Sequence, residues 1–215
     1  MNRKKSFANL LKITCVMVCS CIGTQLVWAD KTNSESITDT AMGTECSVRV
    51  YGSDGTAKDI MEMLSDIENK YLSWRIEGSD IANINENASE SEPVMPSKWT
   101  YSYLENVLDL ARKSSGAFDP TLGRVSQLWN LESDNPYIPS KSELTELLLE
   151  TGWEKISLSD GEVFLKDSVQ IDLGAVGKGI GCDEARKMLE EADADAAVVS
   201  VGGSILTYGK KPDGK

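Results

Sequence analysis

The chain has no histidine among its 215 residues and little cysteine beyond its first stretch. Without histidine it cannot build a zinc site on imidazole ligands or use a histidine general base. Three of its five cysteines precede residue 22, which leaves Cys46 and Cys182. Two cysteines do not make a disulfide framework, although an oxidising compartment would permit a bond between them.

Long hydrophobic runs are also missing. An apolar run at about 13–22 is too short to span a bilayer, which takes about 20 residues. It follows basic residues at 3–5, so residues 1–29 are predicted to be an export signal. The processing of this signal stays open between three routes. It could be cleaved after Ala29, cleaved at a lipobox so that Cys21 becomes the acylated N-terminus, or retained as an anchor. Each predicts an exported domain, in the periplasm or on the outer face of the cytoplasmic membrane.

Positive charge is scarce, with 22 basic against 34 acidic residues. Residues 1–29 hold four basic and no acidic residues, so the chain after them carries a formal charge of −16. This charge argues against nucleic acid, because duplex binding depends on neutralising phosphates with Lys and Arg. A polyanionic ligand would need local donors or a bridging metal against this field.

The apolar pattern predicts a polar linker at 30–36 and an α+β domain over 37–215. Strand signals and helix signals occur in blocks, which favours a mixed or antiparallel sheet with packed helices. The predicted strands are 37–51, a hairpin at 153–165, 169–173, 196–201 and 205–208. The predicted helices are 56–72, 79–85, 98–113, 123–129, 140–150 and one that follows Gly179 to about Glu191. The chain halts in a loop after a strand, so we expect the C-terminal part of the domain to be incomplete.

The segment 171–179 is the strongest candidate for ligand binding. It predicts a strand that delivers Asp172, a glycine-rich turn, and Lys178 at a helix N-terminus, where unpaired N–H groups and the helix dipole attract phosphate. Gly174 and Gly177 are too close together for a Walker A loop. A tight strand-to-helix turn with a solvated lysine is the structural alternative, and it stays open.

Three shorter motifs could also contact a ligand. Asp119 precedes a proline, so its carboxylate could hold a polar ring edge with Phe118 packed alongside, or it could form a turn after a helix C-cap. Trp74 could stack on a flat cofactor or lie in the core. Met42 could cover an aromatic ring, or pack in the core beside a β-bulge at Gly43.

The order of these motifs, from about residue 37 to 215, resembles the ApbE family. Two of the motifs, Gly-Ala-Phe-Asp-Pro-Thr and Asp-Leu-Gly-x-x-x-Lys-Gly, are quite specific to it. The full succession is Met-Gly-Thr at 42–44, Leu-Ser-Trp-Arg at 72–75, Ile-Asn at 84–85, Gly-Ala-Phe-Asp-Pro-Thr at 116–121, Ile-Asp-Leu-Gly-Ala-Val-Gly-Lys-Gly at 171–179, Gly-Gly at 202–203 and Pro-Asp-Gly-Lys at 212–215.

The resemblance implies an α+β fold related to the T-fold, with FAD and Mg²⁺ bound. It implies a transferase that attaches FMN from FAD to a Thr or Ser of a target flavoprotein and releases AMP. Typical targets are flavin-bearing subunits of ion-pumping redox complexes, and many members are lipoproteins or secreted. Ala175 matches a position whose backbone carbonyl binds Mg²⁺. The positions that match FAD contacts are Met42, Trp74, Ala117, Phe118, Asp119, Asp172 and Lys178.

The sequence departs from the family pattern at Ser200, where Asn is frequent, and at Ser204, where Asp or Asn is common. The family also continues with a His-Ile-x-Asp-Pro-like segment and a later Asp and Thr that complete its metal site. None of these occurs in this sequence, so we expect an incomplete Mg²⁺ site. No catalytic residue is assigned.

Three other functions stay open. An FAD pyrophosphatase would use water in place of the protein hydroxyl and release FMN and AMP. A non-catalytic FAD-binding lipoprotein would bind FAD without turnover. A generic exported binding domain would use the motifs only as turns.

Overall fold

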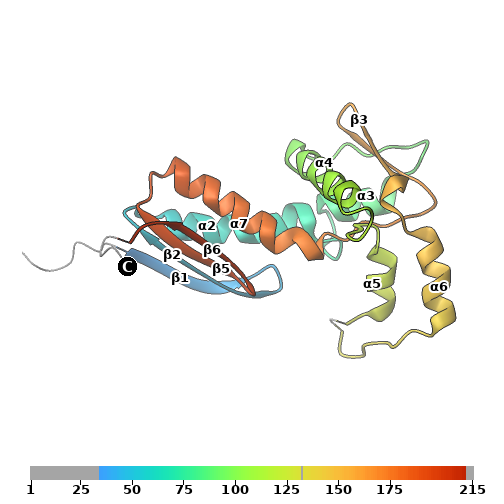
Figure 1. The fold of residues 1–215 in the computed structure, drawn as a ribbon, viewed down its shortest axis with the longest axis horizontal. Helices are drawn as coiled ribbons and strands as arrows, with labels where there is room; N and C mark the ends of the chain where they lie inside the picture. The colour runs from blue at the N-terminus through green and yellow to red at the C-terminus, as the bar shows by residue number, and fades with distance from the viewer. Residues whose placement is uncertain (1–33, 132, 212–215) are drawn as a thin grey trace, which may run out of the picture.

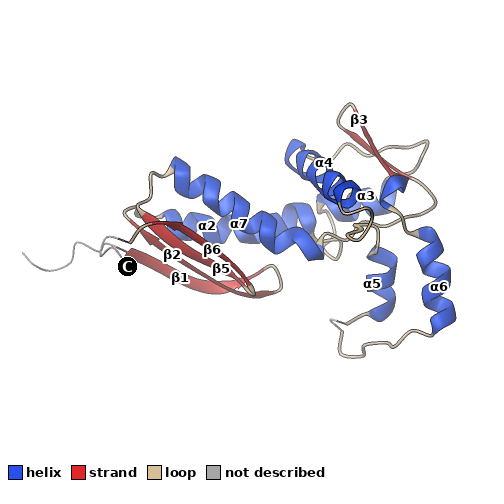
Figure 2. Cartoon of the chain, in the orientation of Figure 1, coloured by secondary structure: helices blue, strands red, loops and turns tan. Residues whose placement is uncertain are grey.

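A computed structural model describes residues 34–131 and 133–211. The predicted signal at 1–29 lies outside these residues. Within them, no helix combines the length and the hydrophobicity that crossing a membrane requires. The fold is α+β with antiparallel sheets, as predicted (Figure 2).

The main sheet has four antiparallel strands in the order β1-β2-β5-β6. All eight residues of β1 pair with β2, so the sheet takes in Ser34 to Ser36 from the predicted linker at 30–36. The central pair, β2 with β5, joins segments that are far apart in the sequence. The bounds of the strands are β1 (Ser34–Ala41), β2 (Thr44–Tyr51), β5 (Ala196–Val201) and β6 (Ser204–Gly209).

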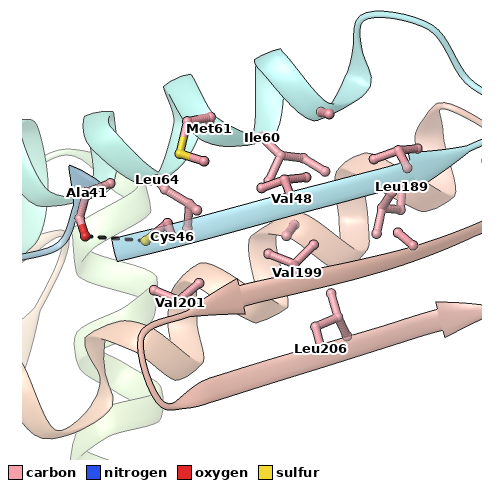
Figure 3. Close-up of a cluster of buried hydrophobic side chains, with 14 of the residues drawn as sticks. Ala41, Cys46, Val48, Ile60, Met61, Leu64, Leu189, Val199, Val201 and Leu206 are labelled. Atoms are coloured by element: carbon pink, nitrogen blue, oxygen red, sulfur yellow. Dashed lines mark hydrogen bonds between the residues drawn. The ribbon is translucent and has the colours of Figure 1, made fainter. Parts of the chain in front are cut away.

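Helices α2 (Thr56–Asp66) and α7 (Gly174–Glu191) cover one face of this sheet (Figure 1). Strand alternation turns Val48 of β2 and Val199 of β5 toward the helices, where both side chains are fully buried. Leu64 of α2 meets them in the same cluster (Figure 3). This cluster is the first of two hydrophobic cores.

The second core lies in the part of the chain between α2 and α7, which Figure 1 shows beyond one end of the sheet. Ile81, Leu104 and Val163 are fully buried there. The elements between α2 and α7 are the π-helix η1 (Ile67–Leu72), α3 (Asp80–Asn87), α4 (Lys98–Lys113), α5 (Gly123–Trp129), α6 (Lys141–Glu150), the 3₁₀ turn η2 (Trp153–Lys155), β3 (Ile156–Ser159) and β4 (Glu162–Leu165). Of these, α5 and α6 add no side chain to the second core, which also takes in Ile180 of α7.

The predictions that rest on residues close together in the sequence are confirmed for two helices and one hairpin. Helices α4 and α5 have the predicted bounds, and β3 and β4 form the predicted hairpin. Ser140 and Glu143 form a capping box at the start of the predicted helix α6, with Ser140 accepting the Glu143 N–H and the Glu143 carboxylate accepting the Ser140 N–H.

The predicted strand at 169–173 was wrong. Residues 169–173 pair with other backbone only at an isolated parallel bridge between Leu122 and Gln170, and the Ile171 backbone bonds a side chain, so no strand forms. The Gln170 carbonyl accepts from the Gly123 N–H, the Ile171 backbone bonds the Asn85 side chain, and the Asp172 N–H donates to the Pro120 carbonyl. The helix also begins earlier than predicted, because the glycine-rich run itself forms the first turns of α7.

Polar contacts fix α4 against α7. Tyr103 of α4 donates its hydroxyl to Glu184 of α7, which also binds Lys187 at 2.6 Å. Burial, together with the hydrogen bond to the Glu184 carboxylate, raises the pKa of Tyr103 to about 12. Trp99 packs between the rings of Tyr71 and Tyr103, at centroid distances of 4.7 and 4.4 Å. These contacts hold the second core onto α7.

Two glycines of α7 provide a matched test of this packing. A Cβ at Gly181 would lie 2.7 Å from Leu64 Cδ2, whereas a Cβ at Gly179 would meet nothing within 4 Å. We expect Gly179→Ala to raise the free energy of unfolding by about 0.5–1 kcal/mol, because alanine favours the helix. The free energy of unfolding of Gly181→Ala should be about 1–3 kcal/mol lower than that of Gly179→Ala, because the added methyl group has no space in the packed core. Chemical denaturation measures both, and equal stabilities would contradict the close approach of α7 to α2.

Candidate functional site

A pocket of about 360 Å³ lies where the two parts of the molecule meet. Its walls are the turn between β1 and β2, the end of η1 with the loop that follows, and the N-terminal turns of α7. This volume falls in the range of about 300–1,000 Å³ that is typical of small-molecule sites. The pocket brings together five of the eight predicted site residues, which are Met42, Trp74, Asp172, Ala175 and Lys178.

Met42 enters the pocket from a two-residue hairpin turn, and not from the bulge that the sequence left open. The turn is Met42-Gly43, with φ angles of 54° and 64° between the paired residues Ala41 and Thr44. Both positive φ angles match a type I′ turn, which Gly43 adopts freely and methionine rarely does. The Met42 side chain packs against α7, where its Sδ would lie 3.2 Å from a Cβ at Gly181.

Glu68 is a pocket residue that the sequence analysis missed. Its carboxylate accepts the Met42 N–H at 2.6 Å and so holds the unusual turn in place. Glu68 lies in the π-helix η1, whose wider winding shows in the Ser73 N–H that donates to the Glu68 carbonyl five residues earlier. Such π segments are frequent at functional sites. No sequence signal marked it, since residues 56–72 follow an ordinary helical pattern.

Trp74 presents a buried polar atom without a partner. Its indole Nε1 is buried and makes no hydrogen bond, and no other buried side-chain nitrogen or oxygen among the described residues is in this state. The guanidinium of Arg75 lies 4.1 Å from the centroid of the Trp74 ring. An unpaired buried N–H is costly, and this one belongs to a side chain that lines the pocket, so a ligand acceptor that reached it would remove the cost.

Asp172 and Lys178 stand at the N-terminal end of α7. Asp172 Oδ1 accepts the Gly174 N–H at 2.8 Å, an Asx turn just before α7, whose N-cap residue Leu173 makes no side-chain cap. Gly174 and Ala175 are exposed, and Lys178 is half-buried one turn further along. The helix end, its dipole and the lysine together favour an anionic group such as phosphate at this wall.

The other three predicted site residues, Ala117, Phe118 and Asp119, do not line the pocket. Asp119 Oδ1 accepts both the N–H and the hydroxyl of Thr121, at 2.8 and 2.6 Å, so its carboxylate closes its own turn. Phe118 packs against the second core, and Ala117 is exposed. The motif reaches the pocket only through Pro120, whose carbonyl accepts the Asp172 N–H at 2.8 Å.

The described residues do not by themselves form a magnesium site. Two carboxylates line the pocket, those of Glu68 and Asp172, and each already accepts a backbone N–H. Nowhere in residues 34–131 and 133–211 do three His, Cys, Asp or Glu side chains gather as metal ligands would. Ala175, the predicted carbonyl ligand, lies in the first turn of α7. Magnesium requires near-octahedral oxygen coordination, so further oxygens would have to join these.

A model of the family described as "ApbE family" matches residues 42–215. The chain belongs to the ApbE family. Among curated relatives of this ApbE chain, the FAD:protein FMN transferase of Treponema pallidum (strain Nichols) is 32% identical over 184 residues, which cover 79% of this chain and 50% of the relative. The Haemophilus influenzae protein of the same name is 28% identical over 195 residues, covering 84% and 56%. The chain thus spans about half the length of the curated relatives that it matches.

Solved structures agree with this assignment. The ApbE protein from Thermotoga maritima superposes with a TM-score of 0.75 and 32% identity, covering 85% of this chain and 61% of that one. The flavin transferase ApbE from Vibrio cholerae has a TM-score of 0.76 at 22% identity, covering 85% and 62%, which supports the fold alone. The predicted family and the predicted α+β fold are therefore confirmed.

The bond between Glu68 and the turn can be tested by two substitutions. Glu68→Ala leaves the Met42 N–H without its acceptor, so we expect the free energy of unfolding to fall by about 1.5–3 kcal/mol. Glu68→Gln keeps an acceptor oxygen at the same reach and should cost less than half as much. Chemical denaturation measures the difference, and equal losses in the two variants would show that the hydrogen bond does not stabilise the turn.

Proposed function

We propose that the whole protein transfers FMN from FAD to a Thr or Ser hydroxyl of a target flavoprotein and releases AMP. The observation that carries the proposal is that Met42, Trp74, Asp172 and Lys178, from separate segments of the chain, line one pocket. Membership of the ApbE family and the printed names of the relatives support it.

Two groups of lining residues suit different parts of FAD. The Trp74 side offers an indole ring and an unpaired N–H, which suit a flat heteroaromatic ring with acceptor atoms. The α7 side offers a helix N-terminus and Lys178, which suit the pyrophosphate. We therefore assign the flavin end of FAD to the Trp74 wall and the phosphates to the α7 wall.

The reaction is a phosphoryl transfer. The acceptor hydroxyl attacks the phosphorus on the FMN side, a phosphoester bond forms, and the bond to the AMP oxygen breaks. The hydroxyl proton leaves to a base, and AMP departs with the negative charge. Lys178 and the α7 N-terminus stabilise the charge that develops on the phosphate oxygens.

The proposal also includes a bound Mg²⁺, a class of target protein and a location for the enzyme. Mg²⁺ would neutralise the pyrophosphate when bound, and Asp172 with the Ala175 carbonyl are the candidate ligands on this chain. The proposed targets are flavin-bearing subunits of ion-pumping redox complexes. The proposed location is outside the cytoplasm, through the export signal or lipid anchor predicted at 1–29.

Transfer is tested by the intact mass of an acceptor domain incubated with the protein, FAD and Mg²⁺. We expect a mass gain of one FMN, and an approximately 100-fold slower gain with Lys178→Ala, because a pre-organised charge on the phosphate is lost. Lys58→Ala, at an exposed position on α2, is the control. FMN and AMP formed without any gain in acceptor mass would identify a pyrophosphatase, and intact FAD in every reaction would refute the enzyme.

The indole N–H gives a separate test of where FAD binds. Trp74→Phe removes an N–H that has no protein partner, so without ligand it should lose no more stability than Trp153→Phe, which also shortens a side chain packed against the second core. FAD affinity should fall about tenfold if the N–H bonds the ligand, which corresponds to about 1.4 kcal/mol. Trp153→Phe, outside the pocket, is the matched control for calorimetry and denaturation. Unchanged FAD affinity would contradict the assignment of the flavin to this wall.

A further inference from the structure

Asn85 of α3 binds the backbone of Ile171 with both atoms of its side-chain amide. Its Nδ2 donates to the Ile171 carbonyl at 2.8 Å, and its Oδ1 accepts the Ile171 N–H at 2.7 Å. These are the two bonds that a neighbouring β-strand would exchange with this residue. One side chain thus replaces the strand that residues 169–173 lack.

We call these two hydrogen bonds between Asn85 and Ile171 the clamp, and Ile171 comes one residue before Asp172. Beyond Ile171, the Asp172 N–H donates to the buried Pro120, and Asp172 Oδ1 accepts the Gly174 N–H. Ile171 itself is fully buried. The backbone is therefore held at consecutive residues up to the first residue of α7, and this sets where the carboxylate and the helix N-terminus lie.

Helix α3 is fixed at its other end to the loop that holds Ser73 and Trp74, which also lines the pocket. Ser79 caps α3 by accepting the Ala82 N–H at 3.1 Å, and its hydroxyl donates to the Ser73 carbonyl at 2.5 Å, next to Trp74. Ile84, beside Asn85 in α3, is fully buried in the second core. The helix is thus a rigid link between the Trp74 loop and the Asp172 segment.

We propose that Asn85 is a positioning residue for the phosphate end of the FAD site. It does not line the pocket, and it acts through Ile171 on Asp172 and on the N-terminus of α7. The proposal rests on the proposed function for the identity of the ligand. The amide is required because aspartate would offer no donor to the Ile171 carbonyl and would place a negative charge beside it.

The test compares FAD with riboflavin, which has the flavin ring and no phosphate, by titration calorimetry. Asn85→Ala and Asn85→Asp should each weaken FAD binding at least about tenfold, or about 1.4 kcal/mol, and riboflavin binding less than about twofold. Asn87→Ala is the matched control, since Asn87 lies on the same helix and bonds only the neighbouring Asn83. Equal weakening of both ligands would indicate general loosening and would overturn the positioning role.

Hydrogen exchange separates this proposal from the proposed function. In the unsubstituted protein without ligand, the Ile171 amide should exchange as slowly as the amides of β2 and β5, because its bond to Asn85 is part-buried. Asn85→Ala should speed exchange at Ile171 and Gly174 at least about tenfold while Asn87→Ala leaves it unchanged. Fast exchange at Ile171 in the unsubstituted protein would overturn the clamp. Slow exchange without FAD binding would instead refute the proposed function alone.

Discussion

The close approach of α7 to the turn between β1 and β2 is the contact on which the rest of the structure depends. Met42 can pack against α7 only because Gly177 and Gly181 carry no Cβ at the places where its thioether lies. Met42 also belongs to the edges of both hydrophobic cores. The methionine, held in a left-handed turn by Glu68, therefore joins the sheet, the helix and the second core at one point.

The pocket lies at this junction for a physical reason. Each core is closed by its own buried side chains, and the ends of several elements meet between them. Element ends leave backbone N–H and carbonyl groups unpaired, and they carry side chains that are not needed for packing. The first residues of α7 are of this kind, and Gly174 and Ala175 there are exposed, so a ligand can reach the start of this helix.

The charged side chains that line the pocket balance one another, unlike those of the whole chain, because Arg75 and Lys178 offset Glu68 and Asp172. The sequence is strongly acidic, with a formal net charge of −12. The two carboxylates of the pocket each accept a backbone N–H, while Lys178 and the start of α7 line the cavity. Local geometry thus creates a place for an anion that the composition alone would disfavour.

The sequence by itself determined the elements whose causes are local. The helical periodicity of α4, the start of α6 at its capping box and the hairpin of β3 and β4 depend on residues within a few positions, so their predictions were accurate. The motifs also identified the ApbE family and five residues of the pocket. Only the tertiary structure decided that residues 169–173 bond the Asn85 side chain in place of a strand, that Asp119 turns to Thr121, and that Glu68 reaches the pocket. These outcomes depend on partners distant in the sequence, or on the choice between a local bond and a ligand, and no periodicity encodes either.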